Sequence, residues 1–181
     1  RCNCSTRFGT PGRNSRREDL DPWSAVLVHL TVFSDSPDEV VIGADLLVLH
    51  RKLVQEAFLV FGSKPFERYE FLLATSNSFG GIGLEHRRSS ENAVRAGYFK
   101  NWDRTVTRRS LLAHEMSHAW NGKFVRPRDL WTPHYNTPMQ NSLLWVYEGQ
   151  TQFWGQVLSA RSGLWSDDMT RGSLAALAAN L

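Results

Sequence analysis

Apolar residues follow two kinds of spacing in the first half of the chain. Residues 25–33 and 67–75 are short runs rich in Val, Leu and Phe, which favours two β-strands. Between them, residues 45–61 place Leu, Val and Phe at helical intervals and are followed by Gly62, the pattern of an amphipathic helix with a glycine stop. The glycine-rich residues 77–91 predict a loop and a short strand.

The second half of the chain is predicted to be helical. Helices are expected over residues 107–121, 141–161 and 167–180. Residues 122–140 contain three Pro and show no period, so they predict a long ordered loop. The order strand, helix, strand, glycine-rich edge and helices is typical of an α+β fold, with helices packed against a small sheet.

Positive charge is concentrated at the start of the sequence. The net charge is +3, but residues 1–17 hold five Arg and no acid, which leaves sixteen basic against eighteen acidic residues beyond them. We therefore interpret residues 1–18 as a flexible basic tail and residues 19–181 as the folded domain. A nucleic-acid-binding arm is the weaker alternative, since the basic isoelectric point does not come from a face of the fold. We expect no nucleic-acid partner.

Several other classes of protein are excluded by simple counts. The longest apolar run, residues 25–33, is interrupted by His29 and is too short to span a membrane. The two cysteines, Cys2 and Cys4, cannot form a disulfide framework or a four-cysteine zinc site. The chain begins with Arg, so a signal or an upstream domain is expected to be missing, and the sequence predicts neither compartment nor oligomeric state.

Chemistry is concentrated in the five residues 114–118, His-Glu-Met-Ser-His. On a helix His114 and His118 lie one turn apart, so both imidazoles can bind one zinc ion. Glu115 projects to the side, where it can reach a water on the metal. The apolar stripe of this helix, with Leu112 and Met116, lies opposite the two His, which favours a metal site over histidines packed in a core.

A catalytic zinc of this kind needs a third protein ligand. A third His six residues after the second is excluded, because position 124 is Phe and position 121, where that class has Gly, is Asn. The only acid between Asp129 and Asp167 is Glu148, on the next predicted helix in mostly apolar surroundings. We therefore predict Glu148 as the third ligand; the alternative is an acid on the surface of an amphipathic helix. Gln152 lies one turn further on, and a weaker prediction is that it orients a ligating His.

The sequence resembles metallopeptidase family 61, the glycyl aminopeptidase-like enzymes of the gluzincin clan. The resemblance rests on GGIGLEH (80–86), HEMSHAWNGK (114–123) and LLWVYEGQTQFWG (143–155), and extends over about residues 37–165. Family members are several times longer, so residues 19–181 are expected to be part of a catalytic domain. The wider aminopeptidase N group is similar at lower resolution, with a Trp at the position of Trp120.

The resemblance implies a thermolysin-like catalytic core that binds one Zn²⁺ per chain. His114, His118 and Glu148 would hold the zinc, and Glu115 would be the general base. Glu85 matches the acid that holds the amino terminus of the substrate in related aminopeptidases. Gly83, with Gly81, would let this edge segment approach a peptide backbone closely, although a plain glycine turn is an alternative.

The predicted function is zinc-dependent hydrolysis of peptides, with removal of small amino-terminal residues such as Gly or Ala. Zinc would polarise the carbonyl and acidify its water, and Glu115 would assist the attack of this zinc-bound water. The donor to the oxyanion stays open among four residues: Tyr98, Tyr135, Tyr147 and His134. The alternative function is a catalytically incomplete remnant that binds a peptide or a partner protein.

Overall fold

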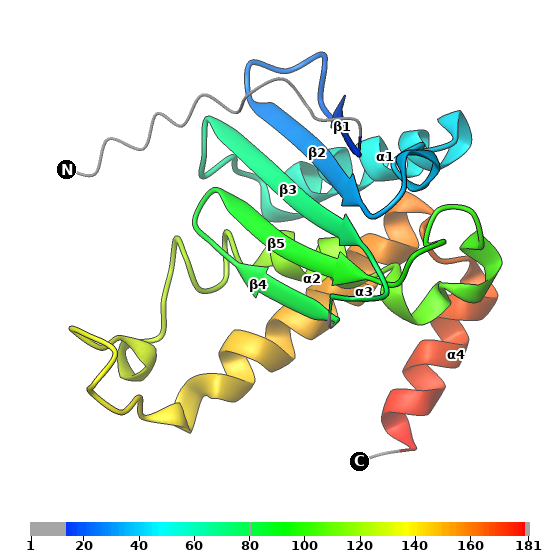
Figure 1. Cartoon of the computed structure of the whole chain (residues 1–181). Coiled ribbons are helices and arrows are strands. Elements are labelled where there is room, and N and C mark those ends of the chain that lie inside the picture. The colour runs from blue at the N-terminus through cyan, green and yellow to red at the C-terminus, as the bar shows by residue number, and fades with distance from the viewer. Residues whose placement is uncertain (1–13, 80, 180–181) are drawn as a thin grey trace.

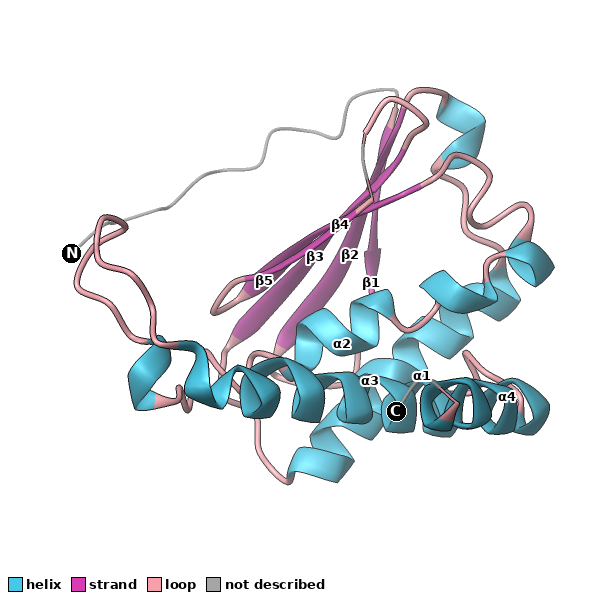
Figure 2. Cartoon of the chain, turned by 90° about the horizontal axis from the view of Figure 1, so that it is seen from below, coloured by secondary structure: helices cyan, strands magenta, loops and turns pink. Residues whose placement is uncertain are grey.

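A five-stranded mixed sheet forms one layer of the molecule, and the helices form the other (Figures 1 and 2). The computed structural model describes residues 14–79 and 81–179. The strand order across the sheet is β1-β2-β3-β5-β4. The strands are β1 (Ser15–Asp19), β2 (Leu27–Ser34), β3 (Arg68–Thr75), β4 (Ile82–Glu85) and β5 (Ser89–Val94).

The three central strands are parallel, and the two edge strands are antiparallel to their neighbours. Leu30 of β2 lies opposite Phe71 of β3, which lies opposite Ser90 of β5. The parallel pair β2–β3 needs a crossover, and α1 (Ala44–Phe61) supplies it. Gly62 ends this helix in the left-handed conformation, with φ of 62°, which confirms the predicted stop.

The remaining helices follow the sheet in sequence and pack on the same face as α1 (Figure 2). They are α2 (Leu111–Ser117), α3 (Gln150–Ser162) and α4 (Asp167–Ala178). A π-helical turn, Trp145–Gly149, leads directly into α3. Short 3₁₀ helices occupy Pro37–Glu39, Trp102–Arg104, Val106–Arg108, Arg128–Leu130 and Asn141–Leu143.

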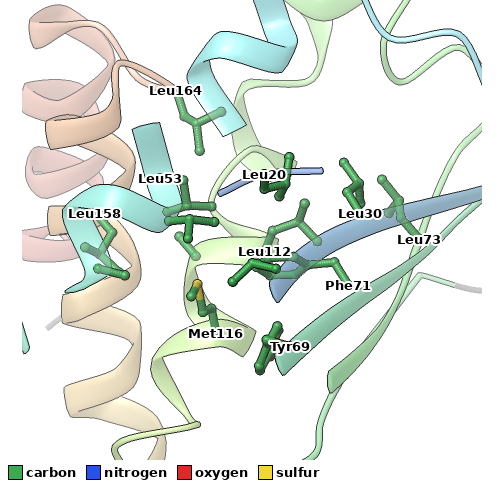
Figure 3. Close-up of a cluster of buried hydrophobic side chains, with 14 of the residues drawn as sticks. Leu20, Leu30, Leu53, Tyr69, Phe71, Leu73, Leu112, Met116, Leu158 and Leu164 are labelled. Atoms are coloured by element: carbon green, nitrogen blue, oxygen red, sulfur yellow. The ribbon is translucent and has the colours of Figure 1, made fainter. Parts of the chain in front are cut away.

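One face of the sheet is buried against the helices and forms the core (Figure 3). Alternate residues of β2 and β3, such as Leu30 and Phe71, are fully buried, as expected for strands with one covered face. Leu112 and Met116 of α2 meet them from the helical layer. Packing in the core therefore fixes the orientation of α2, because the buried face of this helix lies opposite His114 and His118.

The predicted tail boundary at residue 18 differs from the structure. Ser15–Asp19 form β1, which pairs with the edge of β2, and Arg17 donates a hydrogen bond to Glu70 Oε2 at 2.7 Å. A strand that adds to a sheet edge is held by backbone hydrogen bonds and needs no apolar pattern, so the sequence carries little signal of it. Residues 1–13 of the predicted tail lie outside the described residues.

The helix predicted over residues 107–121 is also shorter than expected. Regular α-helix covers only Leu111–Ser117, and Val106–Arg108 precede it as a separate 3₁₀ turn. After Ser117 the hydrogen bonds tighten, with the Trp120 amide donating to the Ser117 carbonyl at 3.1 Å. None of the helices in the described part of the chain is long and apolar enough to cross a membrane.

Candidate metal centre

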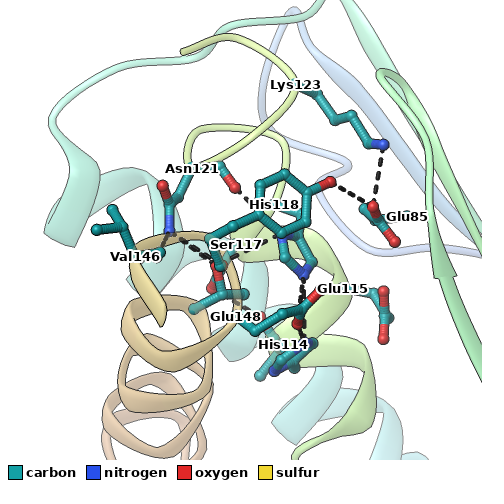
Figure 4. A network of polar contacts seen from close by, with 12 residues as sticks. Glu85, His114, Glu115, Ser117, His118, Asn121, Lys123, Val146 and Glu148 are labelled. Carbon is teal, nitrogen blue, oxygen red and sulfur yellow. Dashed lines mark hydrogen bonds and ion pairs between the residues drawn. The ribbon is translucent and has the colours of Figure 1, made fainter. Parts of the chain in front are cut away.

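His114 of α2 and His118, the residue that follows its last turn, project to the same side, toward the start of α3 (Figure 4). His114 Nε2 and His118 Nε2 lie 3.2 Å apart. His118 is almost completely buried, with 1% of its surface exposed, and the ring of Tyr147 lies beside it with centroids 4.6 Å apart. The one-turn spacing read from the sequence therefore brings both Nε2 atoms to one point.

Glu148 reaches the same point from the π-helical turn before α3. Its Oε2 atom lies 3.3 Å from His114 Nε2 and 3.5 Å from His118 Nε2. Hydrogen bonds with these two histidines lower the pKa of the Glu148 carboxyl to about 2, although burial opposes the shift. Glu148 is therefore a carboxylate at neutral pH, the form that binds a metal.

The three ligand atoms have the spacing that tetrahedral zinc requires. Zinc bonds of about 2.0–2.1 Å place neighbouring ligand atoms about 3.3 Å apart at the corners of a tetrahedron. The observed separations are 3.2, 3.3 and 3.5 Å. His114, His118 and Glu148 therefore fit a zinc ion that keeps its fourth position open.

The tautomer of His118 also suits a metal ligand. Its Nδ1 atom lies 3.1 Å from the backbone carbonyl oxygen of Asn121, which can only accept a hydrogen bond. Nδ1 must therefore carry the proton, and in the neutral ring this leaves the lone pair on Nε2, the atom that faces His114 and Glu148. A backbone carbonyl that orients a histidine in this way is the usual support of a metal-binding imidazole.

Asn121 connects the two elements that carry the ligands. While its carbonyl accepts from His118, its side-chain amide donates to the Val146 carbonyl at 2.8 Å and to Thr151 Oγ1 at 2.9 Å. Val146 lies in the π-helical turn, where the wider winding removes the ordinary α-helical hydrogen bonds. The sequence pattern missed this role, and Gln152, which it favoured, is exposed on α3.

Glu115 is buried between His118 and β4, with a carboxylate oxygen within 4.8 Å of a ring nitrogen of His118. Its Oε2 atom is inaccessible to solvent and has no hydrogen-bond partner among the described residues. Burial raises the pKa of the Glu115 carboxyl to about 7, and the negative charges of Glu85 and Glu148 add to the rise against opposing effects of His114 and Lys123. A carboxyl with a pKa near neutrality can both accept and return a proton.

Gly83 of β4 is packed against this carboxylate. A Cβ atom at position 83 would collide with Glu115 Oε1 and would lie 2.8 Å from a methyl group of Leu111. A larger residue here would displace the Glu115 carboxylate and the Leu111 side chain, because α2 lies close to the strand. This gives Gly83 a packing role, and its predicted contact with substrate stays a prediction; Gly80 of the same motif lies outside the described residues.

Glu85 lies at the other end of β4, close to the metal ligands. The Tyr147 hydroxyl donates a hydrogen bond to its Oε1 atom, and Lys123 Nζ lies 3.0 Å from the same atom. Burial would raise the pKa of Glu85, but these two donors outweigh it and lower the pKa. The carboxylate is therefore charged at neutral pH, about 5 Å or less from Glu115 and His118.

Of the four residues considered as oxyanion donors, the structure brings one to the site. Tyr147 contacts both His118 and Glu85. Tyr98 is buried among aromatic rings of the core, and its ring centroid lies 4.9 Å from that of Phe99. Tyr135 and His134 are exposed on the loop between α2 and α3.

Comparison with known proteins gives two findings. Residues 107–181 match the model of the M61 glycyl aminopeptidase family. The fold is similar to that of an aminopeptidase N family protein from Idiomarina loihiensis, with a TM-score of 0.70 and 22% sequence identity. This similarity covers 87% of the present chain and 27% of that protein, so the chain spans about a quarter of its length. No curated protein matches the chain.

The matched family segment contains all three candidate metal ligands and Glu115. The solved structure extends the likeness in fold to the sheet that precedes this segment, because it covers most of the present chain. Both findings agree with the resemblance inferred from the motifs. Residues 107–181 are therefore similar to the M61 glycyl aminopeptidase family, and the sheet before them is similar in fold to an aminopeptidase N family protein.

Proposed function

We propose that this chain forms the catalytic centre of a zinc-dependent peptidase with a thermolysin-like gluzincin core. The observation that carries the proposal is the meeting of His114, His118 and Glu148 at zinc-ligand spacing, with the buried Glu115 beside them. The family match supports peptide hydrolysis as the reaction. The preferred substrates are peptides whose amino-terminal residue is small, such as Gly or Ala.

A zinc ion on these three ligands would supply Lewis-acid activation of the scissile carbonyl and of a water molecule. The protein itself supplies the proton transfers. Glu115 accepts a proton from the attacking water and returns it to the departing amine, which a pKa of about 7 allows near neutral pH. Of the four residues considered as oxyanion donors, only Tyr147 lies beside the candidate ligands, but its hydroxyl donates its one proton to Glu85 Oε1. Tyr147 would serve as the oxyanion donor only if this hydrogen bond were exchanged on substrate binding.

The substrate backbone is proposed to lie along β4. This strand is at the sheet edge and pairs only with β5 among the described strands, so its outer backbone groups can bind an extended peptide. Glu85 at the end of β4 would bind the amino terminus. Its Oε2 atom accepts no hydrogen bond from the described residues, since Tyr147 and Lys123 both contact Oε1.

The proposal is tested by metal content and by hydrolysis. Purified protein should contain about one zinc per chain and should release the chromophore from alanyl or glycyl chromogenic amides. Glu115→Gln should keep the zinc and lose at least about a hundredfold in kcat/KM, because it removes the proton acceptor. Glu91→Gln, an exposed carboxylate on the next strand, is the matched control and should change neither property.

Two outcomes would contradict the proposal in different ways. Protein without stoichiometric metal would disprove the ligand assignment. Protein that holds zinc but turns over none of these substrates at high concentration would instead favour a peptide-binding remnant without catalysis.

A further inference from the structure

A basic cleft lies at the Gly81 end of β4, beyond the metal centre. It has a volume of about 790 Å³, within the range of small-ligand sites. Its lining includes Arg95, Arg104 and Arg108, and none of the described residues that line it is acidic. The cleft opens where the parallel strands β3 and β5 end, the edge at which sheets of this kind commonly bind ligands.

The three arginines have no fixed partner. Each is exposed, and none forms an ion pair or side-chain hydrogen bond within the described part of the chain. The neighbouring Arg109, by contrast, is buried and donates to the carbonyls of Leu164 and Trp102. Three free guanidinium groups around one cleft favour an anionic ligand, and a carboxylate matches their planar geometry.

Contacts between β4 and residues 108–118 show where this cleft lies relative to the proposed catalytic residues. A Cβ atom at Gly81 would lie 3.5 Å from Arg108 Nη2, Gly83 lies against Glu115, and Glu85 lies near His118. The strand and the helix therefore run side by side in the same direction. Along this line the order is basic cleft, general base and proposed amino-terminus site.

The distances along the strand match a very short peptide. At about 3.4 Å per residue, Gly81 and Glu85 are about 14 Å apart, with Gly83 halfway between them. A peptide whose amino group meets Glu85 and whose scissile bond lies at Glu115 directs its leaving residue toward Gly81 and Arg108. A tripeptide spans about 10 Å at this rise, so its free carboxylate falls within reach of the arginines, and that of a dipeptide is reached when the exposed Arg108 side chain extends toward Gly83.

We propose that Arg108, with Arg95 and Arg104, binds the free α-carboxylate of the substrate on the leaving-group side of the scissile bond. The inference rests on the proposed peptidase function and narrows its substrates to di- and tripeptides with a free carboxyl terminus. Glu85 would bind the amino terminus and Arg108 the carboxyl terminus, so together they would select peptides of this length.

Steady-state kinetics with matched peptides tests this proposal. Glycylglycine should have a higher kcat/KM than its carboxyl-terminal amide. Arg108→Gln should lower the value for glycylglycine by roughly five- to tenfold, as expected for one charge-assisted contact at an exposed site, and leave the amide unchanged. Arg16→Gln, an exposed arginine of the opposite edge strand β1, is the control and should alter neither value.

A second pair of substrates tests whether the cleft binds the α-carboxylate or a side-chain carboxylate. The pair consists of the carboxyl-terminal amides of glycyl-aspartate and glycyl-asparagine, which differ only in the charge of the side chain. A preference for the aspartate peptide as large as that for glycylglycine would show that the cleft binds a side chain, and would overturn the assignment to the α-carboxylate. Equal hydrolysis of glycylglycine and its amide would also overturn it, while leaving the peptidase function intact.

Measuring the affinity for peptides without turnover distinguishes failure of this inference from failure of the proposed function. Calorimetry with the Glu115→Gln protein should show tighter binding of glycylglycine than of its amide, and Arg108→Gln should abolish the difference. If no peptide is hydrolysed but this difference in affinity is present, the carboxylate site stands and the catalytic proposal falls. If the affinities are equal, the carboxylate site is disproved.

Discussion

Lys123 Nζ lies 3.0 Å from Oε1 of Glu85, so the carboxylate proposed to bind the substrate is already paired with a cation. The Tyr147 hydroxyl donates to the same oxygen, and no described residue donates to Oε2. A carboxylate can accept about four hydrogen bonds, so the pairing leaves room for an ammonium. Lys123 and Tyr147 thus keep Glu85 charged and fix its orientation.

The first prediction concerns this carboxylate. Glu85→Gln keeps the shape of the side chain but removes the charge that would bind an ammonium. Loss of one charge-assisted contact should lower kcat/KM for free alanyl peptides by about 10- to 100-fold, with little effect on N-acetylated ones. The measurement is the ratio of the two rates in wild type and variant.

Glu91→Gln again serves as the control, because Glu91 is an exposed acid of β5 that pairs with His86. It should leave the ratio at the wild-type value. A Glu85→Gln protein that still prefers free amino termini as strongly as the wild type would show that another group recognises them.

The second prediction concerns Asn121, which links the ligand-bearing elements. Asn121→Ala retains the backbone carbonyl that orients His118 but removes the amide that holds Val146 and Thr151. Glu148 should then be less well positioned, and zinc affinity should fall by about 10- to 100-fold, the usual effect of losing such a support. Competition with a chelator of known affinity measures the change.

Gln152→Ala distinguishes this geometry from the interpretation based on sequence spacing alone. Gln152 is exposed and lies one turn beyond Glu148. Its loss should leave zinc affinity unchanged. The reverse result, with Gln152 required and Asn121 dispensable, would mean that the hydrogen bonds described for Asn121 do not support the centre.

Much of the candidate metal centre could be predicted because its signals are local. The spacing of His114 and His118 fixes their relation on any helix, and Glu148 was the only acid in a long stretch of sequence. The contacts of Asn121 and Lys123 could not be predicted, because they depend on how the end of α2 meets the π-helical turn and β4. Such contacts join residues far apart in the sequence and leave no period.

The fold shows the same division. The strands β2 and β3 and the helix α1 carry clear apolar patterns, and the structure confirms them within a few residues. The strand β1 has the sequence SRRED and owes its conformation to the free edge of β2. An edge strand of this kind is determined by its neighbour, so its own residues do not predict it.

The third prediction concerns the close contact between α2 and α3, the helix that follows the turn with Glu148. A Cβ atom at Gly155 of α3 would lie 3.2 Å from the backbone nitrogen and Cα of His114, atoms that cannot move without shifting α2. Gly155→Ala should therefore separate the helices and lower both zinc affinity and the free energy of unfolding. A loss of about 1–3 kcal/mol is expected for such overpacking.

Gly172→Ala is the matched control, since Gly172 is a helical glycine of α4 with no atom within 4 Å of the added methyl group. It should leave zinc binding unchanged and stabilise the fold by up to about 1 kcal/mol, because alanine favours the helix. Urea unfolding and chelator competition on the same two variants would contradict the packing argument if Gly155→Ala behaved like Gly172→Ala.

The last prediction is a pH dependence of stability that arises in the core. His50 of α1 is fully buried, contacts the carbonyl oxygen of Leu46 through Nδ1 at 2.7 Å, and packs against Phe99 and Trp102. Burial lowers the pKa of His50 below its ordinary value of 6.5, although the hydrogen bond with Leu46 opposes the shift. The folded protein therefore keeps this ring neutral in mild acid, while the unfolded chain takes up a proton.

Because the unfolded state binds the extra proton, the free energy of unfolding should fall as the pH drops below about 6.5, by at most about 1.4 kcal/mol per pH unit from this residue. His50→Gln cannot titrate, so its stability should fall less steeply between pH 7 and pH 5, whatever its stability at pH 7. His134→Gln, on an exposed loop, should keep the wild-type slope. Urea unfolding of metal-free protein isolates the effect, since the histidines of the metal centre are common to all three proteins. Equal slopes for wild type and His50→Gln would mean that the folded state accommodates a charged His50.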